Sequence, residues 1–286
     1  MNLPYLSQEK INRFIQAALE EDVGKGDHSS LSCIPSEAEN KARLIIKDNG
    51  ILAGLSLAEM IFHYIDPDLQ VKMMKKDGQS VTEGDIGLYV SGRVQSILKA
   101  ERLVLNCMQR MSGIATYTYF LTQLIAGTKA KLLDTRKTTP NLRMLEKWAV
   151  AIGGGVNHRF GLYDMIILKD NHIDFAGGIE KAIQHCKDYL TRHKLTLKIE
   201  VETRNLAEVH EVIRVGGVDR IMLDNMPPAT MIEAVGIIDR RYETEASGGI
   251  NESTIREIAE TGVDFISVGA LTHSIKSLDI SLKAMD

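Results

Sequence analysis

Short apolar runs separated by helical stretches fill the second half of the chain. The runs cover residues 131–134, 165–169, 197–202, 220–224, 242–246 and 265–268. Recurring strand and helix units predict a parallel sheet, and this many of them without a nucleotide-binding fingerprint favour an α/β barrel over an open sheet. Six strands are clear and a seventh is expected within residues 149–156, so the predicted barrel is incomplete.

The first third of the chain has an α+β pattern. Ser7 is placed to cap a helix whose apolar residues follow helical spacing. Asn49-Gly50 predicts a two-residue hairpin turn between strands at 42–46 and 51–53. Further elements are expected as strands at 71–74 and 87–94, a helix at 57–65, and one or two long helices over 97–125 that bridge two domains.

The end of the chain predicts one more strand. Leu278, Ile280 and Leu282 alternate with polar residues, which is typical of a half-buried strand. We expect this strand to pair with the sheet of the first domain. The predicted domains are therefore residues 1–113 with 274–286, and a barrel over residues 114–273.

Composition and charge narrow the functional classes. The chain has 286 residues, 44% of them hydrophobic and 25% charged, and a net charge of -4. A mildly acidic chain gives no reason to expect nucleic acid as a partner, so any basic cluster is a local site. Cys33, Cys107 and Cys186 lack zinc or disulfide spacing and are expected to be reduced core residues. The N-terminal residues lack an apolar leader and no run reaches membrane-spanning length, which predicts a cytoplasmic protein.

Each apolar run of the predicted barrel ends in a polar cluster, and the carboxyl ends of barrel strands open onto one face. The densest region is 134–172. The clusters are Arg136-Lys137, Lys169-Asp170-Asn171, Glu202-Thr203, Asp224-Asn225, Ser247-Gly248-Gly249 and Gly269-Ala270. Any single cluster could simply mark where a strand meets solvent, but the agreement of all six favours an active site.

Strand alternation places several charges inside the barrel. If the aliphatic residues of 197–202 face the helices, then Lys198, Glu200 and Glu202 point inward, and the same phase directs Lys169 and Asp224 inward. Buried charges are costly unless they are paired or bound to a ligand. This set is therefore either an internal ion-pair network or a site.

The cationic and glycine-containing clusters indicate an anionic substrate. Arg136, Lys137, His158 and Arg159 could hold such a ligand jointly, since guanidinium groups suit carboxylate and phosphate. The two glycine turns follow the last two strands, where barrels commonly hold a phosphate, although a small-residue turn without a ligand is the alternative. Glu202 and Asp224 suit a magnesium ion that carries phosphate oxygens.

Other basic residues are weaker candidates from the residues alone. His28, His63, His185, His193 and His210 are expected to be structural, and His172 is a weaker candidate than His158. Arg102, on a predicted helix, is expected to make only surface ion pairs.

At this point several motifs resemble those of the quinolinate phosphoribosyltransferase family. The motifs stand in this order and separation: DTRKTTP, GGGVNHRFGLYDMIILKDNH, IEVET, IMLDN, EASGGI and SVGALTHS. The resemblance covers nearly the whole chain. It implies an N-terminal α/β sandwich domain joined by the C-terminal segment, an incomplete seven-stranded α/β barrel, and a homodimer or larger assembly with shared sites.

The resemblance also implies roles for individual residues in decarboxylating transfer of phosphoribosyl from phosphoribosyl pyrophosphate to quinolinate. Arg136, His158, Arg159 and Lys169 would surround the pyridine dicarboxylate, with Lys137 and Thr138 beside the anionic groups and Arg102 supplied by the neighbouring chain. Lys169, Glu202 and Asp224 would be catalytic, and Glu202 and Asp224 would engage Mg²⁺ and the ribose. The 5-phosphate would lie on Ser247, Gly248, Gly249, Val268, Gly269 and Ala270.

Three alternatives remain open. The fold does not fix the acceptor, so a related phosphoribosyltransferase with another acceptor is the nearest. An aldolase-like barrel would use Lys169 as a Schiff-base amine. A regulator that binds a phosphorylated metabolite would bind without turnover.

Overall fold

The computed structural model describes residues 3–285, and these divide by their internal contacts into two compact units. The first unit contains the residues up to 119, residues 139–154 and the residues from 274 on. The second unit contains residues 120–138 and 155–273. The domain boundary predicted between residues 113 and 114 stays a prediction, and by contacts the helix α5 (Arg143–Ile152) belongs to the first unit.

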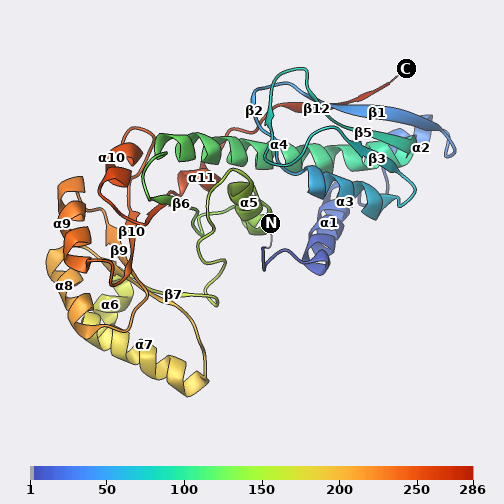
Figure 1. Ribbon diagram of the computed structural model, residues 1–286. Helices are drawn as coiled ribbons and strands as arrows, with labels where there is room; N and C mark the ends of the chain where they lie inside the picture. The colour runs from blue at the N-terminus through green and yellow to red at the C-terminus, as the bar shows by residue number, and fades with distance from the viewer. Residues whose placement is uncertain (1–2, 286) are drawn as a thin grey trace. The chain divides into compact units, whose positions relative to one another are not determined.

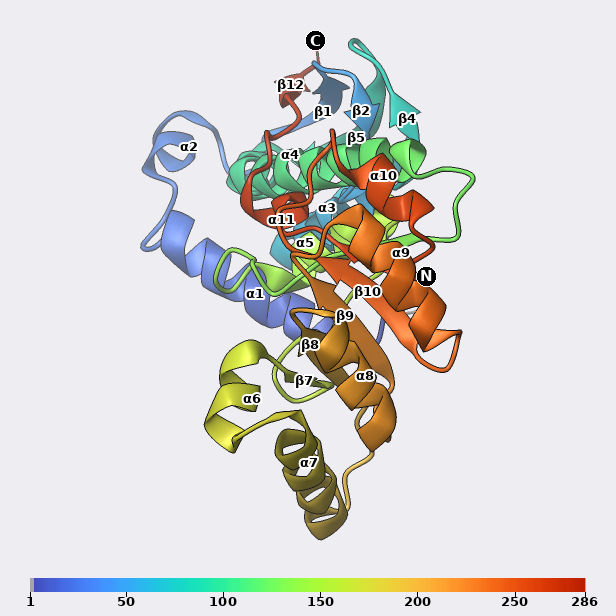
Figure 2. The same ribbon diagram turned by 90° about the vertical axis from the view of Figure 1, so that its left-hand side faces the viewer.

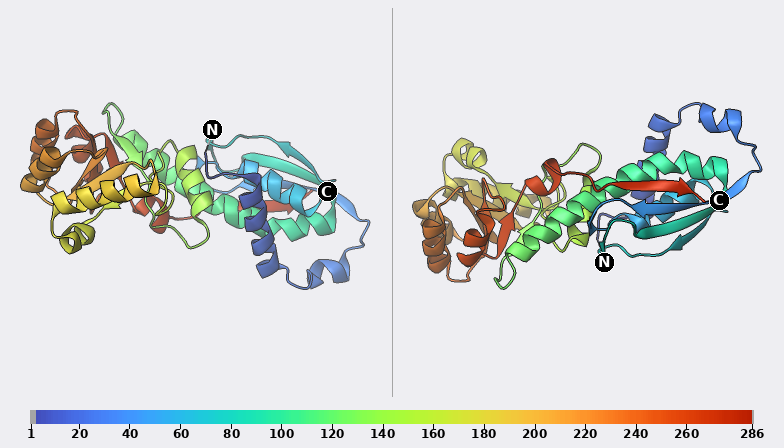
Figure 3. Two further views of the ribbon diagram at one scale, coloured as in Figure 1. Left: turned by 90° about the horizontal axis from the view of Figure 1, so that it is seen from below. Right: turned by 90° about the horizontal axis from the view of Figure 1, so that it is seen from above.

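The first unit is built on a four-stranded antiparallel sheet in the order β12-β1-β5-β3. Its strands are β1 (Glu39–Ile46), β3 (Gln70–Met73), β5 (Ile86–Arg93) and β12 (Ile280–Ala284). Leu282 pairs with Leu44 in this sheet, and the C-terminal strand lies beside β1 in Figures 1 and 3. The prediction that the end of the chain returns to the first sheet is therefore confirmed.

The predicted hairpin at Asn49-Gly50 is wrong. β2 (Gly50–Ile51) pairs with β4 (Ser80–Val81) instead of β1, and neither turn residue has a positive φ. The physical reason is that β1 already pairs on both edges, with β12 and with β5, and has no edge left for β2.

Helices complete the first unit. They are α1 (Gln8–Asp22), α2 (His28–Cys33), α3 (Leu55–Ile65), α5 and most of α4 (Val94–Leu124), which is a single continuous helix. The Ser7 hydroxyl accepts a hydrogen bond from the Lys10 backbone N–H, as expected of an N-cap. No helix in the described part of the chain is both long enough and apolar enough to cross a membrane.

The second unit is built on a parallel six-stranded sheet in the order β6-β11-β10-β9-β8-β7. The strands are β6 (Lys131–Leu133), β7 (Ile166–Leu168), β8 (Ile199–Thr203), β9 (Arg220–Asp224), β10 (Glu243–Ser247) and β11 (Phe265–Ser267). Helices α6 (Asp170–Ala176), α7 (Ile179–His193), α8 (Leu206–Val215), α9 (Pro228–Ile238), α10 (Ile255–Glu260) and α11 (Ala270–His273) connect or follow them. In Figure 2, α8 and α9 cover the outer face of the strands β8 to β10.

The seventh strand position is reduced to one residue. Val156 forms a parallel bridge with Leu133, on the free edge of β6, while the first half of the segment predicted as a strand belongs to the helix α5. Trp148 and its neighbours therefore follow helical rather than strand geometry. The sheet is an open, incomplete α/β barrel, as predicted.

The cysteines agree only in part with the prediction. Cys107 and Cys186 are buried free thiols, but Cys33 is exposed near the end of α2, where its thiol lies 3.1 Å from the Ser29 carbonyl oxygen. The prediction that all three are core residues is wrong for Cys33.

Candidate active site

A cavity of about 960 Å³ opens at the carboxyl ends of the barrel strands. Its lining comes from the five strands β7 to β11 and from the loops near the strand ends, including the loop after β6, which is where α/β barrels place their sites. Of the residues predicted for the site, it brings together Arg136, Lys137, His158, Arg159, Lys169, Glu202, Asp224, Ser247, Gly248, Gly249, Val268, Gly269 and Ala270.

The cations gather on the side formed by the loops after β6 and before α6. Burial, followed by the charge of Arg136, lowers the pKa of Arg159, so these two guanidinium groups lie close enough to repel each other. The Arg159 guanidinium is held by a 3.0 Å hydrogen bond from its Nη1 to the Met165 carbonyl oxygen. Fixed like charges of this kind are costly in an empty cavity and favourable around a dianionic ligand.

The backbone of His158 is fixed by the end of β6. The fully buried Asp134 accepts hydrogen bonds from the His158 backbone N–H at 2.8 Å and from the Asn157 side-chain amide at 2.7 Å. The bridge between Val156 and Leu133 holds the same loop against β6. The sequence therefore positions His158 through a strand end rather than through a flexible loop.

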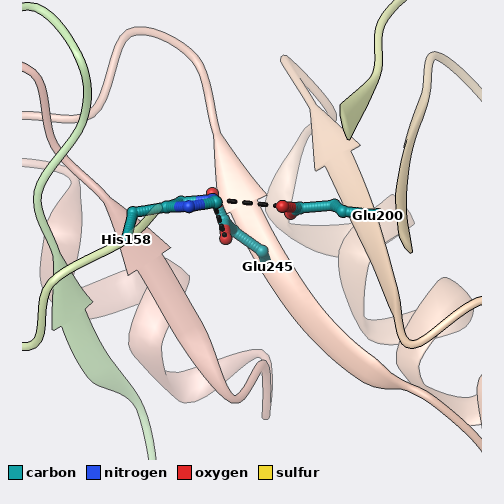
Figure 4. Close-up of side chains that lie close together, drawn as sticks. All are labelled: His158, Glu200 and Glu245. Carbon is teal, nitrogen blue, oxygen red and sulfur yellow. Dashed lines mark ion pairs between the residues drawn. The ribbon is translucent and has the colours of Figure 1, made fainter. Parts of the chain in front are cut away.

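The ring of His158 points toward two buried carboxylates on strands that lie on either side of β9 (Figure 4). Its Nε2 lies 3.1 Å from Glu200 on β8 and 3.3 Å from Glu245 on β10. Burial lowers the pKa of His158, but the two carboxylates outweigh burial and raise it to about 9. The Arg159 backbone N–H donates a hydrogen bond to Nδ1 at 2.6 Å and so opposes protonation of that nitrogen. The two buried carboxylates beside Nε2 are the stronger influence on the pKa.

The buried carboxylates are themselves perturbed. Burial and the charge of Glu245 raise the pKa of Glu200 to about 7. Burial also acts to raise the pKa of Glu245, but its contacts with His158 and Arg220 lower it overall. The Arg220 Nη1 lies 2.8 Å from Glu245, so this strand carboxylate has a cation on each side.

A second carboxylate pair lies at the ends of β8 and β9. Burial and the charge of Asp224 raise the pKa of Glu202, so these two acids lie close to each other in the lining of the cavity. The Lys169 Nζ is 3.7 Å from the Glu202 carboxylate and offsets part of this charge. A divalent cation with oxygen ligands would relieve the remaining repulsion.

The two glycine turns shape the opposite side of the cavity. Gly248 has a φ of +97°, and a Cβ there would lie 2.2 Å from the Asn225 side-chain oxygen. A Cβ on Gly269 would meet Lys137 and His273 at 3.0 and 3.1 Å. Gly248 therefore cannot carry a side chain without displacing Asn225, and both turns line the cavity at the strand ends where barrels commonly hold a phosphate.

Some predicted residues lie elsewhere. Thr138 is not part of the cavity lining, and Arg102 is exposed on α4 in the first unit. His172 accepts the Lys169 backbone N–H at 3.0 Å and caps α6, which is a structural role. Lys198 precedes β8, is largely exposed and pairs with Glu243, so the prediction that it points into the barrel is wrong.

Sequence reasoning missed Glu245 and Arg220. The strand alternation that placed Glu200 inward applies equally to Glu245 two residues before the end of β10, and could have found it. Arg220 begins β9 and shares the phase of Asp224, so the same alternation could have found it as well.

A second hollow of about 1090 Å³ lies at the opposite, amino ends of the strands. Two of its three lysines are engaged by acids, with Lys129 at 2.9 Å from Asp264 and Lys198 at 3.6 Å from Glu243. The hollow therefore offers paired charges rather than a converging cationic site.

An incomplete α/β barrel whose strand ends enclose clustered cations, paired carboxylates and glycine turns defines an enzyme for a substrate with several anionic groups. Two family models match the chain: the N-terminal domain of quinolinate phosphoribosyl transferase over residues 27–112 and its C-terminal domain over residues 114–283. The chain belongs to the quinolinate phosphoribosyltransferase family. The activity of this family, in the biosynthesis of NAD, is the activity of this chain.

Individual relatives agree along nearly the whole chain. Quinolinate phosphoribosyltransferase [decarboxylating] 1b of Nicotiana tabacum is 49% identical over 284 residues, which cover 94% of this chain and 81% of the relative. The chloroplastic nicotinate-nucleotide pyrophosphorylase [carboxylating] of Arabidopsis thaliana shows the same identity and coverage. The crystal structure of NadC from Streptococcus pyogenes superposes with a TM-score of 0.92 at 40% identity and covers 99% of this chain and 100% of its own.

Proposed function

We propose that the cavity at the strand ends binds quinolinate on its cationic side and phosphoribosyl pyrophosphate on its carboxylate and glycine side. The observation that carries this proposal is that one cavity is lined by both sets of groups. Arg136, His158, Arg159 and Lys169 surround the two carboxylates of quinolinate, with Lys137 beside the anionic groups. The glycine turns after β10 and β11 hold the 5-phosphate of the ribose.

The residues of the cavity then perform the transfer mainly by positioning and charge. As pyrophosphate leaves, positive charge develops at ribose C1 while the quinolinate nitrogen attacks from the opposite face. Glu202 and Asp224 stabilise this developing charge, and the cations stabilise the leaving group. The adjacent carboxylate then departs as carbon dioxide beside the Lys169 ammonium; the positive pyridinium nitrogen stabilises the electron pair left on the neighbouring ring carbon, and that carbon takes up one proton from the solvent to give the product.

Glu202 and Asp224 also fit a magnesium ion. They are two oxygen-donor groups at neighbouring strand ends, and burial and the charge of Asp224 raise the pKa of Glu202. When bound, Mg²⁺ supplies charge to the pyrophosphate oxygens. Chelation with EDTA is expected to abolish turnover and added Mg²⁺ to restore it.

The functional assay uses quinolinate, phosphoribosyl pyrophosphate and Mg²⁺, and measures carbon dioxide and pyrophosphate. Equal amounts of the two products support the proposal, and nicotinate in place of quinolinate is the matched control for another acceptor. No turnover with quinolinate would overturn it. Borohydride trapping tests the aldolase alternative, which the half-exposed Lys169 amine beside Glu202 does not favour, because a Schiff-base lysine needs a desolvated free amine.

The assembly is proposed to be a homodimer or a larger homo-oligomer in which Arg102 completes the site of the neighbouring chain. The exposed position of Arg102 on α4 supports this role. Mixing the variants Arg102→Ala and Arg136→Ala under exchange conditions tests it when the assay uses a quinolinate concentration at which each variant alone turns over little, since a mixed dimer has one intact site. Recovery of about a quarter of the wild-type activity is expected for random dimers, and no recovery would contradict a shared site.

The cytoplasm is our proposed location. The printed names of plant relatives include chloroplastic and mitochondrial proteins, so members of the family differ in compartment. Fractionation of the source cells with the activity as the marker would test this location.

A further inference from the structure

A cluster of buried charges lies directly beneath the cavity, and the reaction as described does not use all of it. Glu200, Glu245 and Arg220 are buried on three adjacent strands, and the ring of His158 reaches them from the loop above. Glu245 and His158 line the cavity, whereas Glu200 and Arg220 do not.

These charges are expensive for the fold. Buried ion pairs gain less than they lose on leaving water unless their geometry is very good, and apolar residues would fill the same space at lower cost. The Oε1 atoms of Glu200 and Glu245 also accept no hydrogen bond within residues 3–285, and Oε2 of Glu200 makes the 3.1 Å ion pair with His158. A set of acids retained at such a cost needs a reason other than packing.

A metal ion is not the best explanation of the cluster. One ligand-type atom from each of His158, Glu200 and Glu245 lies within 4.8 Å of the others, which is a spacing that a metal could use. However, the Arg220 guanidinium already occupies the same Glu245 oxygen at 2.8 Å that faces His158. A metal ligand must also be a neutral histidine, whereas the two carboxylates beside Nε2 favour the protonated ring.

We propose that Glu200, Glu245 and Arg220 are positioning residues for quinolinate binding, which fix the orientation of the His158 ring at the cavity wall. The proposal rests on the proposed function, in which His158 borders the quinolinate site. A connected series of contacts supports it: Arg220 holds Glu245, and Glu245 and Glu200 together hold Nε2 of His158 from two different strands. Because both carboxylates contact Nε2, the ring cannot rotate without losing both contacts.

Other charged groups face His158 from the elements around it and contribute to its electrostatic environment. Asp134 at the end of β6 holds its backbone N–H, and Arg159 follows it in the chain with Arg136 nearby. The Arg159 backbone N–H donates a hydrogen bond to Nδ1 at 2.6 Å, and the two strand carboxylates contact Nε2, so the ring is fixed at both of its nitrogen atoms.

A double-mutant cycle between Glu245 and His158 tests the proposal. The four proteins are wild type, Glu245→Gln, His158→Asn and the double variant, each checked by circular dichroism for a native fold. We expect Glu245→Gln to raise the KM for quinolinate about tenfold, as for other residues that orient a ligand-binding histidine, with little change in the KM for phosphoribosyl pyrophosphate. In the His158→Asn background the same substitution is expected to add no further increase.

The matched control is Glu243→Gln on the same strand. Glu243 also pairs with Arg220, at 3.1 Å, but has no contact with His158 among the described interactions. Its KM for quinolinate is expected to stay within about twofold of wild type. If Glu245→Gln misfolds, Glu200→Gln replaces it in the cycle, because Glu200 contacts the same nitrogen.

The possible failures are distinguishable. If wild type does not turn over quinolinate, the proposed function fails before any variant is compared. If wild type is active but Glu245→Gln raises the KM for quinolinate equally in both backgrounds, or raises both KM values alike, the positioning role is wrong and the proposed function stands.

Discussion

Replacing Arg220 by methionine is expected to destabilise the second unit strongly. The Arg220 guanidinium lies 2.8 Å from Glu245 and 3.1 Å from Glu243, and stacks over the Phe265 ring at 4.1 Å from its centroid. Methionine fills much of the same volume but removes the charge. Glu245, which is fully buried, would keep only His158 as a cationic neighbour, shared with Glu200.

The magnitude follows from burial. Breaking a buried pair by removing one partner typically costs roughly 3–5 kcal/mol, because the other charge stays buried without compensation. The Arg214–Glu180 pair provides a matched comparison, since it has the same 2.8 Å separation but side chains that are 60% and 61% exposed. Removing an exposed pair costs less than about 1 kcal/mol.

Thermal and urea denaturation of wild type, Arg220→Met and Arg214→Met measure this difference. For a unit of this size the Arg220 loss corresponds to a fall in Tm of roughly 6–20 °C. The variant Arg220→Met/Glu245→Leu is expected to regain part of the stability, because it leaves His158 paired with Glu200 alone. The reasoning is refuted if Arg220→Met unfolds no more easily than Arg214→Met, or if the double variant is less stable than the single one.

Three further predictions concern the site and the thiols. Arg136→Ala and Arg102→Ala are each expected to raise the KM for quinolinate with the fold intact, because each removes a cation proposed to face a carboxylate; unchanged kinetics for Arg102→Ala would reject its role. The raised pKa of His158, about 9, means that its stabilising contribution is complete below about 6.5 and is lost as the pH rises through 9. The difference in unfolding free energy between wild type and His158→Asn should therefore shrink over that range, and a constant difference would contradict the assignment. Burial raises the pKa of Cys107 to about 12, so iodoacetamide should label the exposed Cys33 first, which mass spectrometry of the peptides can follow.

Much of the barrel could be predicted from the sequence because strand ends and strand alternation are local signals. The polar cluster after each apolar run marks a strand end, and the structure places those clusters around one cavity. Alternation also identified Glu200 and Glu202 as inward-facing residues, and both are buried. The sequence-based choice between an ion-pair network and a site was too narrow, since Glu200 belongs to the network beneath the cavity and Glu202 to the cavity itself.

The wrong predictions involve pairing between distant residues. Asn49-Gly50 has the composition of a hairpin turn, but the edge that β2 would need on β1 is taken by β12 from the other end of the chain. Lys198 follows the alternation of 197–202, but β8 begins only at Ile199, so the lysine reaches solvent. Arg220 shares the inward phase of Asp224, but its pairing with Glu243 and Glu245 on another strand could not be read from the sequence.

The contact between Gly248 and Asn225 limits how this turn can change during evolution. A single substitution of Gly248 by alanine would place Cβ 2.2 Å from the Asn225 oxygen, and the positive φ of +97° adds strain. The adjacent Gly249 has open space at its Cβ position and a φ of +61°, which asparagine tolerates. The two glycines are neighbours with unequal freedom. Position 249 can accept asparagine with no change elsewhere, whereas position 248 can accept a side chain only after residue 225 has been replaced by a shorter residue.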